Sequence, residues 1–315
     1  MENKHTWYTI VNPAGGNGTV QKRWPRIEAA LLQAGVRFEV VFTEARGHAT
    51  ELARNAVESG WRHILAVGGD GTNNETVNGI LQQQAVPPSE VCYALLPVGT
   101  GNDWVRSLGI PKRLSHWLDM FLQGHTSLQD VGVADYHLDG APRQRYFVNV
   151  AGMSFDAYVA KFMDENRRFI NGRFSYLLAL MRCLAKYKLP PTRVHAEGFR
   201  VEDFCYTINA GICRYSGGGM QLVPHAVPDD GLLALTVAKR VTKLGVLFAT
   251  PLFYNGKIAR HPKIEVHSAR NIMVEAIAED RPIGLEVDGE FLGYAPVSFS
   301  LVEKALKVLR PPNKP

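Results

Sequence analysis

The sequence predicts an α/β protein, with an N-terminal parallel α/β domain followed by a mostly antiparallel, β-sandwich-like second domain. Over about the first 130 residues, short apolar runs alternate with helical patterns, which is typical of a parallel sheet covered by helices on both faces. After about residue 134, strand-like runs follow one another among loops rich in Gly, Pro and Asp, which favours antiparallel pairing. We expect domains over 1–134 and 135–301, with 302–315 completing the first.

The elements of the first domain follow from their hydrophobic spacing. The predicted strands are Trp7–Val11, Val36–Thr43, His63–Val67 and Val91–Leu96. The predicted helices run to about Leu32, over His48–Glu58, over Asn73–Gln83 and through Leu108. Pro25 marks either the start of the first helix or a kink in it, because proline lacks the N–H that a helix interior uses.

The elements of the second domain are shorter and less regular. The predicted strands are Tyr146–Val150, Thr207–Gly211, Leu232–Ala238, Lys263–His267, Gly284–Val287 and Val297–Leu301. One helical insertion, roughly Ala157–Leu189, interrupts them. The sequence therefore predicts a β-rich second domain with one helical insertion.

Composition indicates the cellular compartment but does not identify the binding partner. The chain is 46% hydrophobic and 21% charged, which is typical of a soluble globular protein. Its net charge of +5 suits a negatively charged partner, and nucleotide, nucleic acid and anionic membrane all qualify. The cysteines are too scattered for a zinc site or a disulfide framework, which favours a reduced, cytoplasmic setting: Cys92, Cys183, Cys205 and Cys213.

No segment of the sequence reads as a membrane span or a signal peptide. The longest apolar run, Leu244–Tyr254, is too short to cross a bilayer and contains Pro251. Any membrane contact is therefore expected to be peripheral.

Three glycine-rich loops follow three predicted strands, at 12–18, 68–72 and 97–103. The carboxyl ends of parallel strands meet at one edge of a sheet, where ligands bind. Glycines permit positive φ and let backbone N–H groups approach an anion, and a helix that starts after the loop adds its positive end. The loops therefore predict contacts to phosphate or ribose, although tight strand-to-helix turns would have a similar sequence.

Asp70 distinguishes the second of these loops. A carboxylate would repel a nucleotide unless a divalent cation intervened, so Asp70 implies Mg²⁺. Neither G-x-x-x-x-G-K-[ST] nor G-x-G-x-x-G stands at these strand ends, which excludes a P-loop kinase and a standard dinucleotide fold.

In these loops the sequence resembles the diacylglycerol kinase catalytic-domain family, which includes sphingosine and ceramide kinases, and it looks most like the compact bacterial lipid kinases. The motifs that carry the resemblance are Asn12-Pro13 with Gly15-Gly16, Gly68–Glu75, Pro97–Asp103, Asp229–Leu232 and Asp288-Gly289-Glu290. They occur in the family's order from about residue 10 to 300.

The resemblance implies ATP and Mg²⁺ as cofactors. The residues implied to contact ATP are Asn12, Gly15, Thr43, Gly68, Gly69, Asp70, Gly71, Thr72, Asn73, Asn74, Thr100 and Asn102. Asp70, Asp103 and Asp130 would hold the catalytic Mg²⁺, partly through water. Asp230, with the backbone of Val227 and Leu232, would hold a second, structural Mg²⁺, although the same residues would also form a capped β-turn.

The resemblance places the catalytic base in the motif Asp288-Gly289-Glu290. Phosphoryl transfer needs a group that orients and deprotonates the attacking hydroxyl. Both carboxylates remain candidates, and Glu290 is favoured with Asp288 in support. A hairpin turn with charged flanks is the alternative reading.

The hypothesis is therefore a lipid kinase that phosphorylates diacylglycerol or a related lipid with a free hydroxyl. NAD kinase and a catalytically silent nucleotide or lipid sensor are the alternatives. A basic stretch with interleaved aromatic residues, 161–193, fits either peripheral contact with an anionic membrane or an ordinary solvated helix. We expect no nucleic-acid partner, and the sequence leaves a homodimer open.

Overall fold

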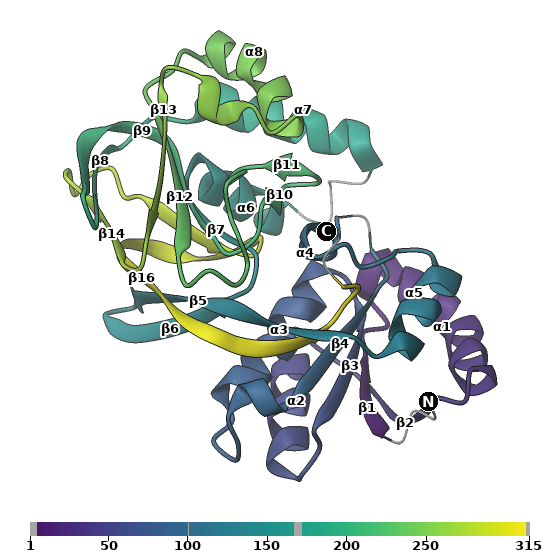
Figure 1. Ribbon diagram of the computed structural model, residues 1–315. Coiled ribbons are helices and arrows are strands. Elements are labelled where there is room, and N and C mark those ends of the chain that lie inside the picture. Colours follow the sequence, from purple (N-terminus) through teal and green to yellow (C-terminus); the bar gives the residue numbers. More distant parts are fainter. Residues whose placement is uncertain (1–4, 100, 167–171, 313–315) are drawn as a thin grey trace. The chain divides into compact units, whose positions relative to one another are not determined.

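The computed structural model describes residues 5–99, 101–166 and 172–312, and they form two compact units whose elements Figure 1 shows. The first unit consists of Met1–Val131, Pro228–Asp230 and Val302–Pro315, and the second of Gly132–Val227 and Gly231–Leu301. The C-terminal segment and the short loop at 228–230 therefore belong with the N-terminal part of the chain.

A parallel sheet forms the centre of the first unit, as the sequence predicts. Its strands are β1 (Thr6–Val11), β2 (Arg37–Phe42), β3 (His63–Gly68), β4 (Cys92–Pro97) and the end of β16 (Glu290–Leu309). They lie in the order β16–β4–β3–β1–β2, and each neighbouring pair is parallel. Strand β3 is buried from Ile64 onward, in keeping with its continuous apolar sequence.

Helices cover both faces of this sheet. They are α1 (Gly15–Gln33), α2 (His48–Glu58), α3 (Asp70–Gln82), the 3₁₀ turn η1 (Pro88–Glu90), α4 (Asp103–Ser107) and α5 (Leu114–Gln123). Figure 1 shows α2 and α3 on one face and α1 and α5 on the other. Trp117 and Phe121 of α5 stack on each other in the core, and Phe121 also contacts Trp7 of β1.

Two helix boundaries differ from the expected ones. Helix α3 begins at Asp70, three residues before the predicted start at Asn73, because the first-turn amides favour a carboxylate at that position. Pro25 does not start the first helix but lies inside α1, whose irregular part is Gly16–Gly18 with positive φ.

The second unit is built from antiparallel strands, which confirms the predicted fold class. Its strands are β6 (Ala141–Phe147), β7 (Val150–Ser154), β8 (Pro191–Ala196), β9 (Phe199–Gly211), β10 (Tyr215–Ser216), β11 (Met220–Gln221), β12 (Leu233–Lys239), β13 (Ile264–Ala269), β14 (Ile272–Ala276) and β15 (Gly284–Val287), with parts of β5 (Thr126–Leu138) and β16. The central strands follow the order β13–β12–β9–β7–β15–β16. Every pairing between β12, β13, β9, β7 and β15 is antiparallel.

Its helical segments are α6 (Phe155–Glu165), α7 (Gly172–Lys186), α8 (Lys243–Tyr254) and the 3₁₀ turn η2 (Ile258–Arg260). The helical insertion predicted over 157–189 thus consists of two helices, α6 and α7. The apolar run at 244–254 forms a further helix, α8, which the sequence did not predict. Among the described residues, no helix is both long and apolar enough to cross a membrane.

The single strand predicted over Tyr146–Val150 is wrong. Strand β6 ends at Phe147 and β7 begins at Val150, with a bend at Val148 and Asn149. The amides in and after this bend donate hydrogen bonds to the carboxylate of Asp288. A long-range contact therefore turns the chain where local propensity favours one strand.

Candidate functional site

The first unit has its glycine-rich loops at the carboxyl ends of neighbouring strands. The segments after β1, β2, β3 and β4 lie at one edge of the sheet because these strands are parallel. They contain residues 12–18, 43–47, 69–72 and 98–103. The sheet therefore places the predicted nucleotide-binding segments along one edge.

The first loop is tied to α3 by a side-chain hydrogen bond. Asn12 Nδ2 donates to Thr72 Oγ1 at 2.9 Å, while its Oδ1 accepts the amide of Ala14 at 3.1 Å. Gly16 and Gly18 have φ values of 58° and 77°, which glycine adopts without strain. Asn12 therefore fixes the loop after β1 against the start of α3.

Close approach, rather than positive φ, explains Gly68. A Cβ on Gly68 would lie 2.4 Å from Thr72 Oγ1, and Gly69 and Gly71 also lie outside the positive-φ region. Glycine at position 68 lets α3 begin directly above the end of β3. The first-turn amides of α3 can then present their partial positive charge to an anion.

Asp70 connects the loops after β3 and β4. Its Oδ2 accepts the amide of Asn102 at 2.7 Å, and its Oδ1 accepts the amide of Asp103 at 3.1 Å. Burial and the neighbouring Asp103 carboxylate raise the pKa of Asp70, while the backbone amides oppose that rise. A Cβ on Gly101 would lie 2.8 Å from Asp70 Oδ2, so this contact requires glycine there.

A lysine lies beside this pair of carboxylates. The Lys112 ammonium donates to the carbonyl of Gly101 at 3.0 Å. Burial and Arg106 lower the pKa of Lys112, whereas the charges of Asp103 and Asp70 raise it. Lys112 is therefore a cation within electrostatic reach of both predicted Mg²⁺ ligands.

Asp130 is held by backbone groups of its own unit. Its amide donates to the carbonyl of Pro228 at 2.8 Å, and its Oδ1 accepts the amide of Lys304 at 2.7 Å. Within 5–99, 101–166 and 172–312, no group of three or more His, Cys, Asp or Glu side chains is close enough to hold a metal by itself. Asp70 and Asp103 still fit Mg²⁺, because this ion binds through one or two carboxylates, water and substrate phosphate.

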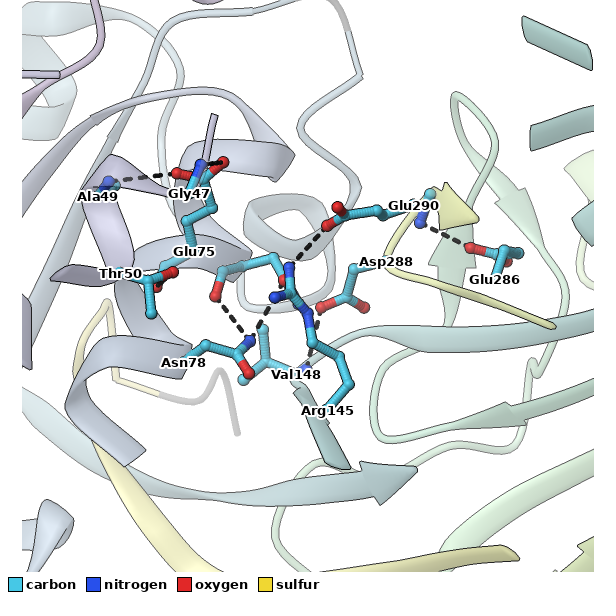
Figure 2. A network of polar contacts seen from close by, with 12 residues as sticks. Gly47, Ala49, Thr50, Glu75, Asn78, Arg145, Val148, Glu286, Asp288 and Glu290 are labelled. Carbon is cyan, nitrogen blue, oxygen red and sulfur yellow. Dashed lines mark hydrogen bonds and ion pairs between the residues drawn. The ribbon is translucent and has the colours of Figure 1, made fainter. Parts of the chain in front are cut away.

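The remaining predicted ATP residues have varied surroundings. Asn73 Oδ1 accepts the buried hydroxyl of Tyr93 at 2.8 Å, so its side chain packs inward. Thr43 directly follows β2, and its amide donates to the carbonyl of Val11 at 2.9 Å. Glu75, which belongs to the motif but not to the predicted ATP contacts, accepts the amides of Gly47 and Ala49 at the start of α2 (Figure 2). Thr100 lies outside the described residues.

In the second unit, Asp288 is locked by backbone amides (Figure 2). Its Oδ1 accepts the amides of Asn149 and Val150, each at 3.1 Å, and its Oδ2 accepts that of Val148 at 3.2 Å. Asp288 adopts φ of 49°, an uncommon conformation for a non-glycine residue. The carboxylate therefore stabilises the bend between β6 and β7.

Glu290 differs from Asp288 in its partner and its exposure. Its Oε2 lies 2.6 Å from Arg145 Nη2, and the two side chains are 28% and 18% exposed. Figure 2 shows the Arg145 guanidinium reaching the Glu290 carboxylate from strand β6. The two carboxylates of the motif thus have different surroundings: Asp288 is held by backbone amides, and Glu290 by a cation at a partly exposed position.

Two further carboxyl groups lie behind this motif. Burial raises the pKa of Glu286 well above its usual value, and the charges of Asp156 and Asp288 add to that rise. Burial also raises the pKa of Asp156 to about 6, against hydrogen bonds from Thr207 and Asn209. The unit therefore encloses carboxyl groups that favour the protonated form.

The segment predicted to hold a second Mg²⁺ is a loop between β11 and β12. Asp230 and Val227 are exposed and Leu232 is partly buried. Pro228–Asp230 belong to the first unit, in which the carbonyl of Pro228 accepts the amide of Asp130. The metal assignment for Val227, Asp230 and Leu232 stays a prediction.

Comparison with known protein families shows which family the chain belongs to. Residues 6–134 match the family described as "Diacylglycerol kinase catalytic domain". Residues 149–310 match "YegS C-terminal NAD kinase beta sandwich-like domain". The chain belongs to the diacylglycerol kinase catalytic-domain family. The resemblance found in the sequence motifs is thereby confirmed.

Individual relatives of this family span nearly the whole chain. A protein of Staphylococcus aureus named "Diacylglycerol kinase" is 28% identical over 302 residues, which cover 96% of this chain and 91% of that protein. The crystal structure of a diacylglycerol kinase from Bacillus anthracis shares the fold, with a TM-score of 0.71, 22% identity and coverage of 98% and 97%. Yeast NADH kinase shares it more distantly, with a TM-score of 0.51, 10% identity and coverage of 96% and 82%.

Two contacts of the motif residues in this diacylglycerol kinase family member could not be predicted from the sequence. Lys112 and Arg145 are single cations outside any motif, and only the fold brings them to Gly101 and Glu290. Lys112 lies five residues after the short helix α4, and Arg145 lies inside strand β6. Neither position carries a sequence signal of such a partner.

We predict that the stability of this family member depends on pH through Asp156. Its pKa rises from 3.8 to about 6 on folding, so the native state holds its proton more tightly than the unfolded state. The free energy of unfolding should therefore fall as pH rises through this window, by an amount on the order of 3 kcal/mol from this group. The Asp156→Asn variant should show a flatter dependence in urea unfolding between about pH 4 and pH 6.

Asp164→Asn, an exposed change on the same helix, is the matched control and should keep the wild-type pH dependence. Equal slopes in wild type and Asp156→Asn would show that Asp156 does not carry the effect.

Proposed function

We propose that the chain is an ATP- and Mg²⁺-dependent lipid kinase that transfers the γ-phosphate to a hydroxyl of diacylglycerol or a related lipid. The observation that carries the proposal is the position of Asp70, the first residue of α3. Its carboxylate accepts the backbone amides of Asn102 and Asp103 at 2.7 Å and 3.1 Å. Family membership supports kinase chemistry. The relative from Staphylococcus aureus named "Diacylglycerol kinase" supports a lipid acceptor.

The first unit would bind the nucleotide. Backbone amides at the start of α3 suit phosphate oxygens, since a helix N-terminus favours anions. The further ATP contacts of the proposal are Asn12, Gly15, Thr43, Gly68, Gly69, Gly71, Thr72, Asn73, Asn74, Thr100 and Asn102. Asp70 and Asp103 would hold Mg²⁺, with Asp130 acting through water. When bound, this ion supplies positive charge that neutralises the phosphate oxygens during transfer.

The second unit would supply the base. The hydroxyl oxygen of the lipid forms a bond to the γ-phosphorus, the bond from that phosphorus to ADP breaks, and the hydroxyl proton passes to a carboxylate. We assign this role to Glu290, because Asp288 already accepts three backbone amides and holds the bend at Val148. Arg145 would fix the position of the Glu290 carboxylate. Asp230 with the carbonyls of Val227 and Leu232 remains the proposed structural Mg²⁺ site.

NAD kinase is the second candidate function. It is favoured by the description of the second matched domain as NAD kinase-like and by the fold similarity to yeast NADH kinase. The carboxylate pair Asp288 and Glu290 and the loop at 97–103 favour the lipid acceptor instead.

We predict transfer of label from γ-labelled ATP to an organic-soluble product. The protein would be incubated with ATP, Mg²⁺ and micelles that contain diacylglycerol, phosphatidylglycerol or a sphingoid base in turn, with NAD as a separate acceptor. Label in one lipid supports the proposal and names the acceptor. Label in NADP would contradict it, and intact ATP binding without transfer to any acceptor would favour a silent sensor.

We predict that Glu290→Gln lowers kcat by about 10²–10⁴ while the affinity for ATP stays at the wild-type level. The amide keeps the shape of the side chain but cannot take the proton. Glu303→Gln, an exposed change further along β16, is the control and should keep full kcat. Wild-type kcat in Glu290→Gln would remove Glu290 from the role of base.

A further inference from the structure

Helix α8 is apolar on two opposite faces. Its inner face packs into the second unit: Val246 contacts the core cluster that includes Phe155 and Cys183, and Phe253 contacts the cluster that includes Val150. Its outer face is equally apolar but exposed: Leu244 is 67%, Phe248 82% and Tyr254 55% exposed. Only the inner face is needed to hold the helix on its unit.

The exposed residues form one continuous stripe. Leu244, Leu247, Phe248 and Pro251 are exposed and follow the spacing i, i+3, i+4 and i+7 of one helix face. Single exposed apolar side chains are ordinary, whereas a contiguous apolar patch marks a contact surface.

Helix α7, to which the start of α8 is hydrogen-bonded, also carries exposed apolar side chains. Leu178 and Met181 are 55% and 39% exposed, while Leu184 and Leu180 of the same helix pack on the cluster that Val246 contacts. The Lys243 ammonium donates to the carbonyl of Ala185, which joins the start of α8 to the end of α7. Figure 1 shows both helices on the same side of the second unit. We call the exposed side chains the apolar face, and they are Leu178, Met181, Leu244, Leu247, Phe248 and Tyr254.

The two segments that carry the apolar face contain basic residues and no acidic ones. Residues 178–191 contain three Lys or Arg residues and no Asp or Glu, and residues 240–263 contain five and none. These cations are Arg182, Lys186, Lys188, Arg240, Lys243, Lys257, Arg260 and Lys263. The whole chain, in contrast, has 35 basic and 30 acidic residues, so these two segments are strongly biased towards positive charge.

We propose that the apolar face docks on an anionic lipid surface, with its leucines and Phe248 in the acyl boundary and the surrounding cations at the headgroup phosphates. The inference rests on the proposed function, since a kinase with a lipid acceptor must meet the bilayer that holds it. A second copy of the chain fits this face less well, because a two-fold interface would bring the same cations opposite one another.

The surface differs from the one that the sequence indicated. The basic stretch 161–193 contributes only its α7 portion to the apolar face, and Arg167 and Arg168 lie outside the described residues. The larger contribution comes from α8, about sixty residues later in the chain. From the sequence alone, its apolar run at 244–254 is notable only as a segment too short to span a bilayer.

A dye at position 248 tests the docking directly. The native cysteines are all buried, so a Phe248→Cys variant of the full chain can be labelled selectively with an environment-sensitive fluorophore. We expect a blue shift and a rise in intensity with vesicles that mix phosphatidylcholine and phosphatidylglycerol, and a much weaker response with phosphatidylcholine alone. A response that depends on protein concentration without vesicles would show that a second copy covers the face, and would overturn the proposal.

Vesicle sedimentation with unlabelled variants gives the matched comparison. Phe248→Ser and Leu244→Ser should each weaken binding to the mixed vesicles by about tenfold, since each removes an inserted apolar side chain. Leu32→Ser is the control, because Leu32 is 62% exposed on α1 of the first unit, and its binding should equal that of wild type. Equal binding by Phe248→Ser and wild type would overturn the proposal.

Activity separates this inference from the proposed function. With a short-chain diacylglycerol dissolved as monomers, Phe248→Ser should phosphorylate the acceptor as wild type does, while its activity on vesicle-borne acceptor should fall with binding. Vesicle binding through Phe248 without any lipid phosphorylation would overturn the proposed function and leave the docking surface standing. Equal loss of activity on both acceptors would count against docking as the role of Phe248.

Discussion

The hydrogen bonds from the amides of Asn102 and Asp103 to the Asp70 carboxylate are the interaction on which the candidate nucleotide site depends. They join the loops after β3 and β4, and they require glycine at 101, where a Cβ would lie 2.8 Å from the carboxylate. Burial and the charge of Asp103 work against ionisation of Asp70, whereas the amides favour it. A carboxylate held in this way has a fixed direction, and a divalent cation would relieve the remaining repulsion.

The second unit also contains a carboxylate that accepts several backbone amides, but there the contact stabilises a bend in the chain. Asp288 accepts the amides of Val148, Asn149 and Val150, and so fixes the bend between β6 and β7. Two residues later, at the start of β16, Glu290 meets Arg145. One motif therefore contains Asp288, whose carboxylate is held by backbone amides, and Glu290, whose carboxylate is paired with a cation at a partly exposed position. This division is the physical reason for assigning the base to Glu290.

The sequence predicts the fold class well because periodicity and glycine punctuation are local signals. The run from His63 into Gly68, for example, identifies both a buried strand and the loop after it. The reasons for individual residues are less predictable. Gly68 and Gly101 are required by contacts with Thr72 and Asp70, which only the folded chain creates. The bend at Val148 and the partners of Lys112 and Arg145 are likewise long-range effects, and the exposure of α8 depends on which of its two apolar faces the unit covers.

We propose that Asp70 links the nucleotide to Mg²⁺, and calorimetric titration of ATP tests this link most directly. Wild type and Asp70→Asn would each be titrated with Mg²⁺ and with a chelator, after unfolding measurements show that both are folded. We predict that Mg²⁺ strengthens ATP binding to wild type by about tenfold or more and that Asp70→Asn loses most of this gain. The same Mg²⁺ effect in both proteins would show that Asp70 does not link the nucleotide to Mg²⁺.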